Sequence, residues 1–445
     1  MKYKKYPSYK DSGISWLGEI PKHWNQRKIK HFAQTIPGGT PSTIEPEYWD
    51  GDIPWLPSGA VQNCIINEDR VIKFITKKGL YNSATKYIKP NSTLIALTGA
   101  TCGNIGYLTF QSTANQSVVG IVTQKSTSDK YVFYSLISQK SQILVKRTGG
   151  AQAGINEQDV KDIFISYPPI QEQQQIANFL DKATAKIDTL IEKQTKQIEL
   201  LKEKRQAVIS HAVTKGIKSN VKMKDSGVEW LGEIPEHWEV TKLKFYVNVK
   251  GRIGFRGYTK DDLVSKEEGA LVIGASEMNN NAKLEIKNPQ YISWYKYYES
   301  PEIILTQGDL LFVQRGSTVG KVAHIDFDIE KATINPSLVV LKRIKLNPSY
   351  LKYYLLSHLI KSIVKVETSN TAIPMISQEQ IGNYTLSIPK KESDQQQIVN
   401  YLEEKTSKID TLIEKSNKSI ELLKEKRTAL ISAAVTGKID VREKV

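Results

Sequence analysis

The chain has 445 residues, 40% of them hydrophobic and 24% charged, which are ordinary values for globular proteins. This length predicts about two to four domains. Lys and Arg outnumber Asp and Glu by 62 to 47, giving a net charge of +15. Such an excess favours a polyanionic partner, because each phosphate that a basic side chain neutralises releases condensed counterions.

The cysteine and hydropathy patterns argue against a disulfide framework, a zinc site and a membrane span. Cys64 and Cys102 are the only cysteines, and their number and spacing fit neither a disulfide framework nor a zinc site. No run approaches the roughly 18 apolar residues of a membrane span, and no apolar segment follows the basic first residues. We therefore expect a cytoplasmic protein without membrane contact.

The first predicted element, DSGISWLGEIPKHW at 11–24, returns almost letter for letter as DSGVEWLGEIPEHW at 225–238. A shared string of this length indicates an internal duplication. Each copy is dense in Trp, Leu, Ile and Pro, and such residues usually pack in a core. We interpret both copies, called straps below, as buried structural segments that lead into a strand.

Two dissimilar middle sections follow the straps, at residues 27–170 and 241–390. Short β-branched runs such as STLIALTG (92–99) and DLLFVQRG (309–316) alternate with turn residues, which predicts short strands. Segments 130–145 and 349–364 carry apolar residues at helical spacing. Each section is therefore predicted to be an α/β domain with one helix near its end, giving one fold with two sequences.

Each repeat ends in a predicted long helix, at 173–213 and 395–435. Most positions in 173–214 are identical to their partners in 395–436. About 40 residues form a rod of about 60 Å, and Gly216 and Gly437 mark the ends. The stripe of apolar positions comprises Ile176, Leu180, Ile187, Leu190, Ile191, Ile198, Leu201, Val208 and Ile209. Two such stripes predict antiparallel, coiled-coil-like packing of the two helices.

The basic and acidic run 202–205, with its copy 424–427, has two interpretations. It is either a solvated face of the rod or a contact with a partner subunit.

No catalytic motif is complete in this sequence. The string GSTVGKV at 316–322 has three residues between its glycines where a P-loop needs four, and Val322 stands where Ser or Thr should bind magnesium. Residues 347–350, Asn-Pro-Ser-Tyr, differ from the Asn-Pro-Pro-Tyr of adenine methyltransferases, and no Gly-rich cofactor loop precedes them. The six histidines lack metal-ligand spacing. We expect a non-catalytic chain that binds no metal and no cofactor.

Several strings together carry a family resemblance: GGTPS (38–42), GDIPWLPSG (51–59), TGATCGNIG (98–106) and PPIQEQQQIANFLD (168–181), with the duplicated strap. In this order the chain resembles the specificity subunit of a type I restriction-modification system, over essentially its whole length. The resemblance implies two target-recognition domains, each of which recognises one half of a split, asymmetric site in double-stranded DNA. The paired helices would set the distance between the halves.

The resemblance also implies partners. Two modification subunits would use S-adenosylmethionine to methylate adenines, and restriction subunits would translocate and cut DNA with ATP and magnesium.

The predicted fold is α/β, with two target-recognition domains separated by two long antiparallel helices and a pseudo-two-fold internal repeat. The predicted segments are the first strap and domain (1–172), the central helix (173–215), the second strap and domain (216–394) and the last helix (395–445).

Candidate DNA contacts lie in Gly-rich loops with polar or basic side chains, since bare backbone can approach phosphates while Arg, Lys, Asn and Gln contact base edges. In the first domain these are Gly38, Gly39, Thr40, Ser42, Thr98, Thr101, Asn104, Asn115, Gln116, Lys146, Arg147 and Gln152. In the second domain they are Arg252, Arg256, Tyr258, Lys260, Arg315, Ser317, Thr318 and Lys321. The matching places of TGATCGNIG and RGSTVGKVA favour a shared backbone role for their glycines.

Two other functions remain open at this point. A self-contained DNA methyltransferase would need a cofactor-binding loop that the sequence lacks. A scaffold whose middle domains bind proteins would not need the 15 excess positive charges.

Overall fold

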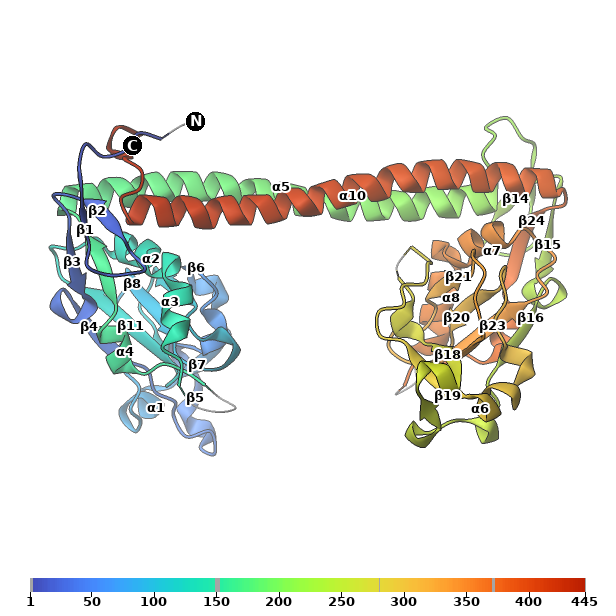
Figure 1. Ribbon diagram of the computed structural model, residues 1–445, viewed down its shortest axis with the longest axis horizontal. Helices are drawn as coiled ribbons and strands as arrows, with labels where there is room; N and C mark the ends of the chain where they lie inside the picture. The colour runs from blue at the N-terminus through green and yellow to red at the C-terminus, as the bar shows by residue number, and fades with distance from the viewer. Residues whose placement is uncertain (1–2, 149–152, 280, 370–372, 445) are drawn as a thin grey trace. The chain divides into compact units, whose positions relative to one another are not determined.

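The computed structural model describes residues 3–148, 153–279, 281–369 and 373–444 (Figure 1). The chain forms two compact units, Met1–Gln194 with Lys418–Val445, and Thr195–Asn417. Each unit contains one α/β domain and one half of each of the two long helices, α5 (Ile170–Lys215) and α10 (Glu392–Val435). The predicted segments instead treated each helix as separate, and those boundaries stay a prediction.

The first unit is built around a five-stranded sheet. Its strands and helices before α5 are β1 (Tyr9–Asp11), β2 (Glu19–Pro21), β3 (Asn25–Lys28), β4 (Ala33–Pro37), β5 (Trp49–Leu56), β6 (Cys64–Ile66), β7 (Lys73–Ile75), α1 (Lys77–Tyr81), β8 (Ser92–Ala96), β9 (Ile105–Leu108), β10 (Thr113–Ala114), β11 (Val118–Thr123), α2 (Asp129–Ser138), α3 (Lys140–Val145), α4 (Glu157–Lys161) and β12 (Phe164–Tyr167). The sheet has the order β4-β11-β8-β9-β6, and a smaller sheet has the order β10-β5-β7.

Successive side chains of the central strand β8 are buried on opposite faces of this sheet. Ile95 belongs to the core that also contains the first strap, α2, the start of α5 and the end of α10. Leu94 and Ala96 belong to a second core on the other face, with Leu56 and Val118. Because successive strand residues point to opposite faces, one apolar run such as STLIAL can contribute to both cores.

The second unit repeats this plan with different residues. Its elements between α5 and α10 are β13 (Met223–Asp225), β14 (Glu233–Pro235), β15 (Trp238–Lys242), β16 (Asn248–Gly251), β17 (Leu263–Val264), β18 (Gly269–Ile273), β19 (Gln290–Ser293), α6 (Trp294–Tyr298), β20 (Leu310–Val313), β21 (Val322–His324), β22 (Ala332–Ile334), β23 (Leu338–Lys342), α7 (Pro348–Leu355), α8 (His358–Thr368), α9 (Gln378–Gly382) and β24 (Thr385–Pro389). The main sheet has the order β16-β23-β20-β21, and a second sheet the order β17-β19-β18-β22.

The prediction of one helix near the end of each domain is wrong, because each amphipathic segment forms two helices. In the first domain α2 ends at Ser138 and α3 begins at Lys140. In the second domain α7 ends at Leu355, and the Ser357 side chain caps α8 by accepting from the Ile360 amide. A serine at this position favours a helix start over continuation of the preceding helix.

The two long helices pack on each other inside each unit, as predicted. In the first unit Ile176 and Leu180 of α5 share a core with Ile431 and Val435 of α10, and the pair Asp188–Arg427 lies further along both helices. This order makes the packing antiparallel. Both helices start slightly before their predicted first residue, at Ile170 and Glu392.

One member of the predicted apolar stripe is exposed, and Ile191, Leu201 and Val208 are only partly buried. Leu190 is 48% exposed, whereas Ile187 and Ile198 are 6% and 8% exposed. The seam that faces the partner helix is therefore narrower than the stripe, as expected when two helices pack without a third.

Each domain is attached to the helix pair of its own unit by the same set of groups. The buried Tyr131 hydroxyl donates to the Ser166 carbonyl at 2.9 Å and the Val435 carbonyl at 3.1 Å. In the second unit the Tyr350 hydroxyl donates to the Ser387 carbonyl at 3.0 Å and the Val213 carbonyl at 3.3 Å. Two dissimilar domains thus share one attachment geometry.

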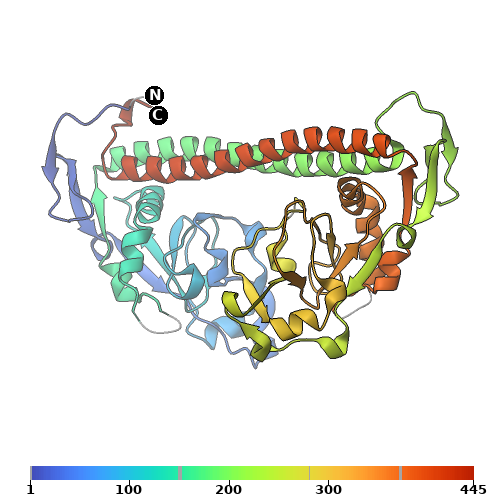
Figure 2. The ribbon, with the colours of Figure 1, turned by 45° about the vertical axis from the view of Figure 1, so that its right-hand side comes forward.

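Both straps form short hairpins, β1–β2 and β13–β14, beside the helix ends. Trp24 and Trp238, at the ends of the two straps, are 0% and 3% exposed, which agrees with a structural role. Figure 2 shows the two chain ends side by side in the first unit, where the Asp440 amide donates to the Lys4 carbonyl at 2.9 Å.

Candidate nucleic-acid interface

Most candidate residues of the first domain gather at one edge of its main sheet. β11 pairs antiparallel with β4 and with β8, so the ends of β4 and β8 lie beside the start of β11. This places loops 38–42, 98–103 and 115–117 together, and we call these loops the first sheet edge. Thr98 also bridges to Gly154, which brings the segment after α3 to the same edge.

Close backbone contacts hold the first sheet edge. A Cβ on Gly38 would lie 2.1 Å from the Asn115 carbonyl oxygen, and one on Gly39 would lie 2.5 Å from the Thr85 nitrogen. Only glycine allows this approach, so the two glycines shape the edge. Thr40 donates to the exposed amide oxygen of Gln116, which orients that amide.

The second domain forms an equivalent edge from residues 251–252, 314–321 and 335–337, which we call the second sheet edge. Gly99 and Gly103 have φ values of +67° and +76°, and their counterparts Gly316 and Gly320 have +105° and +85°. The Gly103 amide donates to the Ala96 carbonyl at 2.8 Å, as the Gly320 amide donates to the Val313 carbonyl at 2.9 Å. The two Gly-rich strings therefore share the positive φ values of their glycines and the same hydrogen bond across the turn.

A turn that sequence reasoning missed completes both edges. The Asn115 side chain accepts from the Ser117 amide at 3.2 Å, and the Asn335 side chain accepts from the Ser337 amide at 3.0 Å. The sequence could have predicted this turn, because NQSV at 115–118 and NPSL at 335–338 share Asn and Ser at the same spacing. Asparagine at such a position forms its own turn.

The side chains presented on this common frame differ. Thr98 corresponds to Arg315, Gln116 to Pro336 and Asn104 to Lys321 in the matching turns. Of the candidates, Ser42 and Gln116 in the first domain and Arg315, Ser317 and Thr318 in the second are exposed, and Thr40, Thr98, Thr101, Asn115 and Lys321 are partly buried.

Other candidates lie inside their domain. Asn104 is 6% exposed and its side-chain oxygen accepts from Lys140 Nζ at 2.7 Å. Arg252 is 7% exposed and donates to the Thr333 hydroxyl at 3.2 Å. Both side chains are used in internal contacts, which the sequence pattern of a polar residue in a Gly-rich loop did not reveal.

The remaining candidates flank the edges. Lys146 and Arg147 are exposed after α3, and Arg147 Nη2 donates to the Ala153 carbonyl at 2.9 Å. Arg256 pairs with Glu302 at 3.4 Å. The Arg252 guanidinium lies over the Tyr258 ring at 5.4 Å, Lys260 is exposed, and Gln152 lies outside the described residues.

The strings that only partly resembled catalytic motifs have structural roles. The Asn347 side chain caps α7 by accepting from the Tyr350 amide at 3.1 Å, and its Nδ2 donates to Gln396 at 2.7 Å. The string at 316–322 forms the turn of the second sheet edge.

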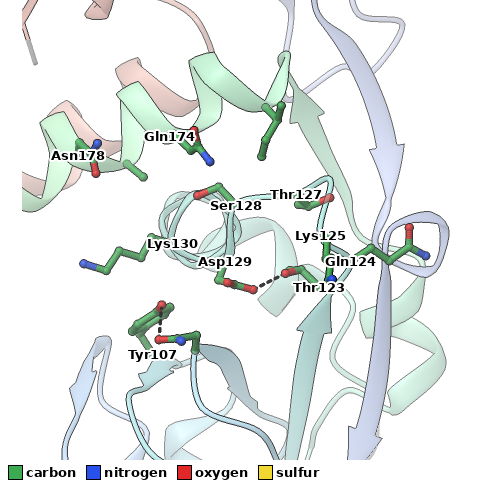
Figure 3. A pocket seen from close by; sticks show the side chains of 13 residues that line it. Tyr107, Thr123, Gln124, Lys125, Thr127, Ser128, Asp129, Lys130, Gln174 and Asn178 are labelled. Atoms are coloured by element: carbon green, nitrogen blue, oxygen red, sulfur yellow. Dashed lines mark hydrogen bonds between the residues drawn. The ribbon is translucent and has the colours of Figure 1, made fainter.

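A polar groove of about 690 Å³ in the first unit lies at the opposite edge of the main sheet, beside α5 (Figure 3). Burial raises the pKa of Asp129 there, and burial with the nearby carboxylates raises the pKa of Tyr107 to about 12. Lys130 is paired with Asp181. A half-buried carboxyl and a paired lysine make this groove a poor site for a polyanion.

Within the described residues, no group of three or more His, Cys, Asp and Glu side chains could hold a metal ion. No helix in the described part of the chain is long and apolar enough to cross a membrane.

A family model, the type I restriction modification DNA specificity domain, matches the chain twice, over residues 21–200 and 235–422. The chain belongs to this family. As a type I specificity subunit, it is the non-catalytic recognition component of its system. Members of the family are generally without cofactors.

Relatives match along the whole specificity subunit. The MjaVIII specificity subunit of Methanocaldococcus jannaschii is 25% identical, covering 95% of this chain and 94% of the relative. The MjaIX specificity subunit of the same organism is also 25% identical, and the match covers 100% of this chain and 99% of that relative. A solved chain of a type I R-M system, described for complex assembly and conformational transition, aligns with a TM-score of 0.70 at 14% identity, over 94% of this chain and 98% of that one. This likeness supports the fold.

Proposed function

We propose that this specificity subunit recognises a bipartite, asymmetric site in double-stranded DNA, one half with each sheet edge. The observation that carries the proposal is that the two edges have the same turns and backbone hydrogen bonds but present different side chains. A common frame suits a common ligand, the duplex, whereas different side chains suit different base sequences.

We assign different tasks to the exposed and the internal candidates. Gln116, oriented by Thr40, and the exposed Arg315 would contact base edges, since an amide fits adenine and a guanidinium fits guanine. Ser42, Thr98, Thr101, Asn115, Lys146, Arg147, Gln152, Lys260, Ser317, Thr318 and Lys321 would contact DNA around them. Gly38 and Gly39 would shape the first edge, and Asn104, Arg252, Arg256 and Tyr258 would support the two edges from within.

We assign the chemistry to partner subunits. Two modification subunits would bind S-adenosylmethionine and methylate adenines, and restriction subunits would bind ATP and magnesium. Exposed residues such as Gln174 and Asn178 are identical to Gln396 and Asn400 in the copy, which supports a partner present twice. Since genomic DNA is the proposed ligand, the complex would work in the cytoplasm.

The test is to express the chain with its modification subunits and map methylated adenines across the host genome. The proposal expects one sequence with two defined halves and an undefined spacer. Replacing residues 27–170 with the corresponding domain of another specificity subunit should change one half alone. Methylation without a sequence preference, or a swap that alters both halves, would contradict the proposal.

A further inference from the structure

The second unit contains a groove of about 440 Å³ between the turn of the second sheet edge and helix α8. The turn contributes the hydroxyls of Ser317 and Thr318 and the amine of Lys321. Helix α8 contributes Lys361 and Lys365. No lining residue of the groove in the described part of the chain is acidic.

The geometry of the turn and the helix keeps these groups together. Gly320, at a φ of +85°, lies against Val364 so closely that a Cβ would be 3.0 Å from Cγ1 of that valine. Lys361 and Lys365 are four residues apart and therefore share one face of α8. The carboxylate of Glu367 on the same helix instead accepts from the Tyr384 hydroxyl at 3.3 Å.

None of the three groove lysines forms an ion pair with a described residue, and the carboxylate of Glu285, which pairs with Lys287, is the one charge of opposite sign that attracts Lys321 from nearby. Lys321 Nζ contacts the Ala275 carbonyl at 3.5 Å, and Lys361 Nζ donates to the side-chain oxygen of Gln206. Neither of these partners carries a charge. Burial lowers the pKa of Lys361, and repulsion from Arg205 lowers it further. Three clustered cations that form no ion pair favour an anion in the groove.

We propose that this groove holds a phosphate of the DNA backbone beside the second sheet edge, with Lys321 and Lys365 as its cations and Ser317 and Thr318 as hydroxyl donors. This inference rests on the proposed function, because it presumes that the second domain binds DNA. Lys361 adds a third positive charge to the lining of the groove. Hydroxyl and amine donors are typical phosphate ligands in protein–DNA complexes.

The two lysines proposed to hold the phosphate in the second domain are not repeated in the first. In the first domain Gly103 lies against Leu144, as Gly320 lies against Val364. This match places Asn104 at the position of Lys321, and Val145 at the position of Lys365. Neither residue carries a charge, and the positive charge at this place in the first domain comes instead from Lys140, whose Nζ lies 2.7 Å from the Asn104 side-chain oxygen.

The test measures equilibrium binding of the complex with its modification subunits to a duplex containing the methylated site and to a scrambled duplex, across a salt series. The variants are Lys321→Gln, Lys365→Gln and Lys365→Arg, and the matched control is Lys224→Gln, an exposed lysine on strand β13 of the same unit. Thermal unfolding of each variant checks that the second unit remains folded.

Each neutral variant of the groove should lower the slope of log K against log salt by about 0.9, equally for both duplexes. Lys365→Arg should keep the wild-type slope, and Lys224→Gln should leave it unchanged. An unchanged slope in Lys321→Gln and Lys365→Gln would overturn the phosphate site, while selective binding by the wild type would still support the proposed function. A wild-type complex that does not distinguish the duplexes would instead refute the proposed function.

Two other outcomes would also overturn the phosphate site. A variant that alters the methylated sequence would show that the lysines contact bases. A variant that releases the modification subunits would show that the groove binds an acidic protein segment.

Discussion

Arg205 and Asp410 form a two-point ion pair across the long helices of the second unit, with Nε–Oδ1 and Nη2–Oδ2 distances of 2.8 and 3.2 Å. In the first unit Arg427 pairs with Asp188 in the same way, at 2.9 and 3.3 Å. Arg427 and Asp410 are the copies, in the second repeat, of Arg205 and Asp188. Each pair therefore joins one copy of the repeat to the other, and one duplicated sequence fixes the register of both helix halves.

The first prediction concerns this ion pair. Arg205→Ala should lower the free energy of unfolding by about 1 kcal/mol, since both side chains are partly buried and the pair is bidentate. Arg427→Ala should cost less, because Asp188 is 52% exposed against 29% for Asp410. Urea denaturation of Arg205→Ala, Asp410→Ala and the double variant measures the interaction free energy between the two side chains. Additive losses would show that the pair does not hold the helices.

The second prediction concerns the attachment tyrosines. Tyr350→Phe leaves the buried carbonyls of Ser387 and Val213 without the hydroxyl donor, which should cost about 1–3 kcal/mol. In Tyr350→Phe, hydrogen exchange should increase in the second unit only. In Tyr131→Phe, it should increase in the first unit only. Uniform loss of protection in both units after either change would contradict a local role.

A third prediction follows from the same tyrosines at alkaline pH. Burial raises the pKa values of Tyr131 and Tyr350 above the usual value of 10.0. The folded chain therefore favours the protonated phenols, so this stability is complete below about pH 10 and is lost as the pH rises above it. The urea midpoint should fall progressively as the pH rises above about 10. The Tyr350→Phe variant should lose less stability than the wild type over the same rise in pH.

Much of this architecture was predictable because repeated residues recur in repeated contacts. The straps, the two helices and their antiparallel packing follow from strings that the second half of the chain repeats almost unchanged. The break at Gln139 and the exposure of Leu190 were not predictable from spacing alone. Helical periodicity continues across both positions, whereas tertiary packing decides where a helix stops and how wide its buried face is.

The candidate site was predictable in its backbone more than in its side chains. Glycines at matching places, such as Gly99 and Gly316, indicated a shared backbone role, and both glycines have positive φ values. Whether a polar side chain faces outward depends on partners far along the chain. Asn104 is turned inward by Lys140, and Arg252 by Thr333, and no local pattern encodes such contacts.

The fourth prediction concerns the shape of the first sheet edge. Gly38→Ala would place a methyl group 2.1 Å from the Asn115 carbonyl oxygen, so loop 38–42 or the Asn115 turn must move, at a cost of about 1–3 kcal/mol. We expect weaker methylation at DNA sites with the correct first half, and unchanged preference at the second half. Gly59→Ala is the control, since a Cβ there meets no atom within 4 Å. Equal effects of both variants would contradict the role of Gly38.

The fifth prediction concerns the length of the long helices. Gln194 and Ser416 are equivalent positions, and seven residues inserted after each preserve the heptad seam. Each helix then lengthens by about 10 Å, or about three base pairs of a duplex that rises about 34 Å per ten pairs. Because neither sheet edge changes, the two half-sites should stay the same while the spacer grows by up to about three base pairs.

Sequencing of methylated adenines in cells expressing the lengthened chain measures both halves and the spacer at once. Seven residues inserted into the 216–222 linker provide the control, which should keep the original spacer. If only α5 receives the insertion, Arg205 moves about 10 Å out of register with Asp410, and binding should be lost. An unchanged spacer in the doubly lengthened chain would show that the domains, rather than the helices, set the distance between the half-sites.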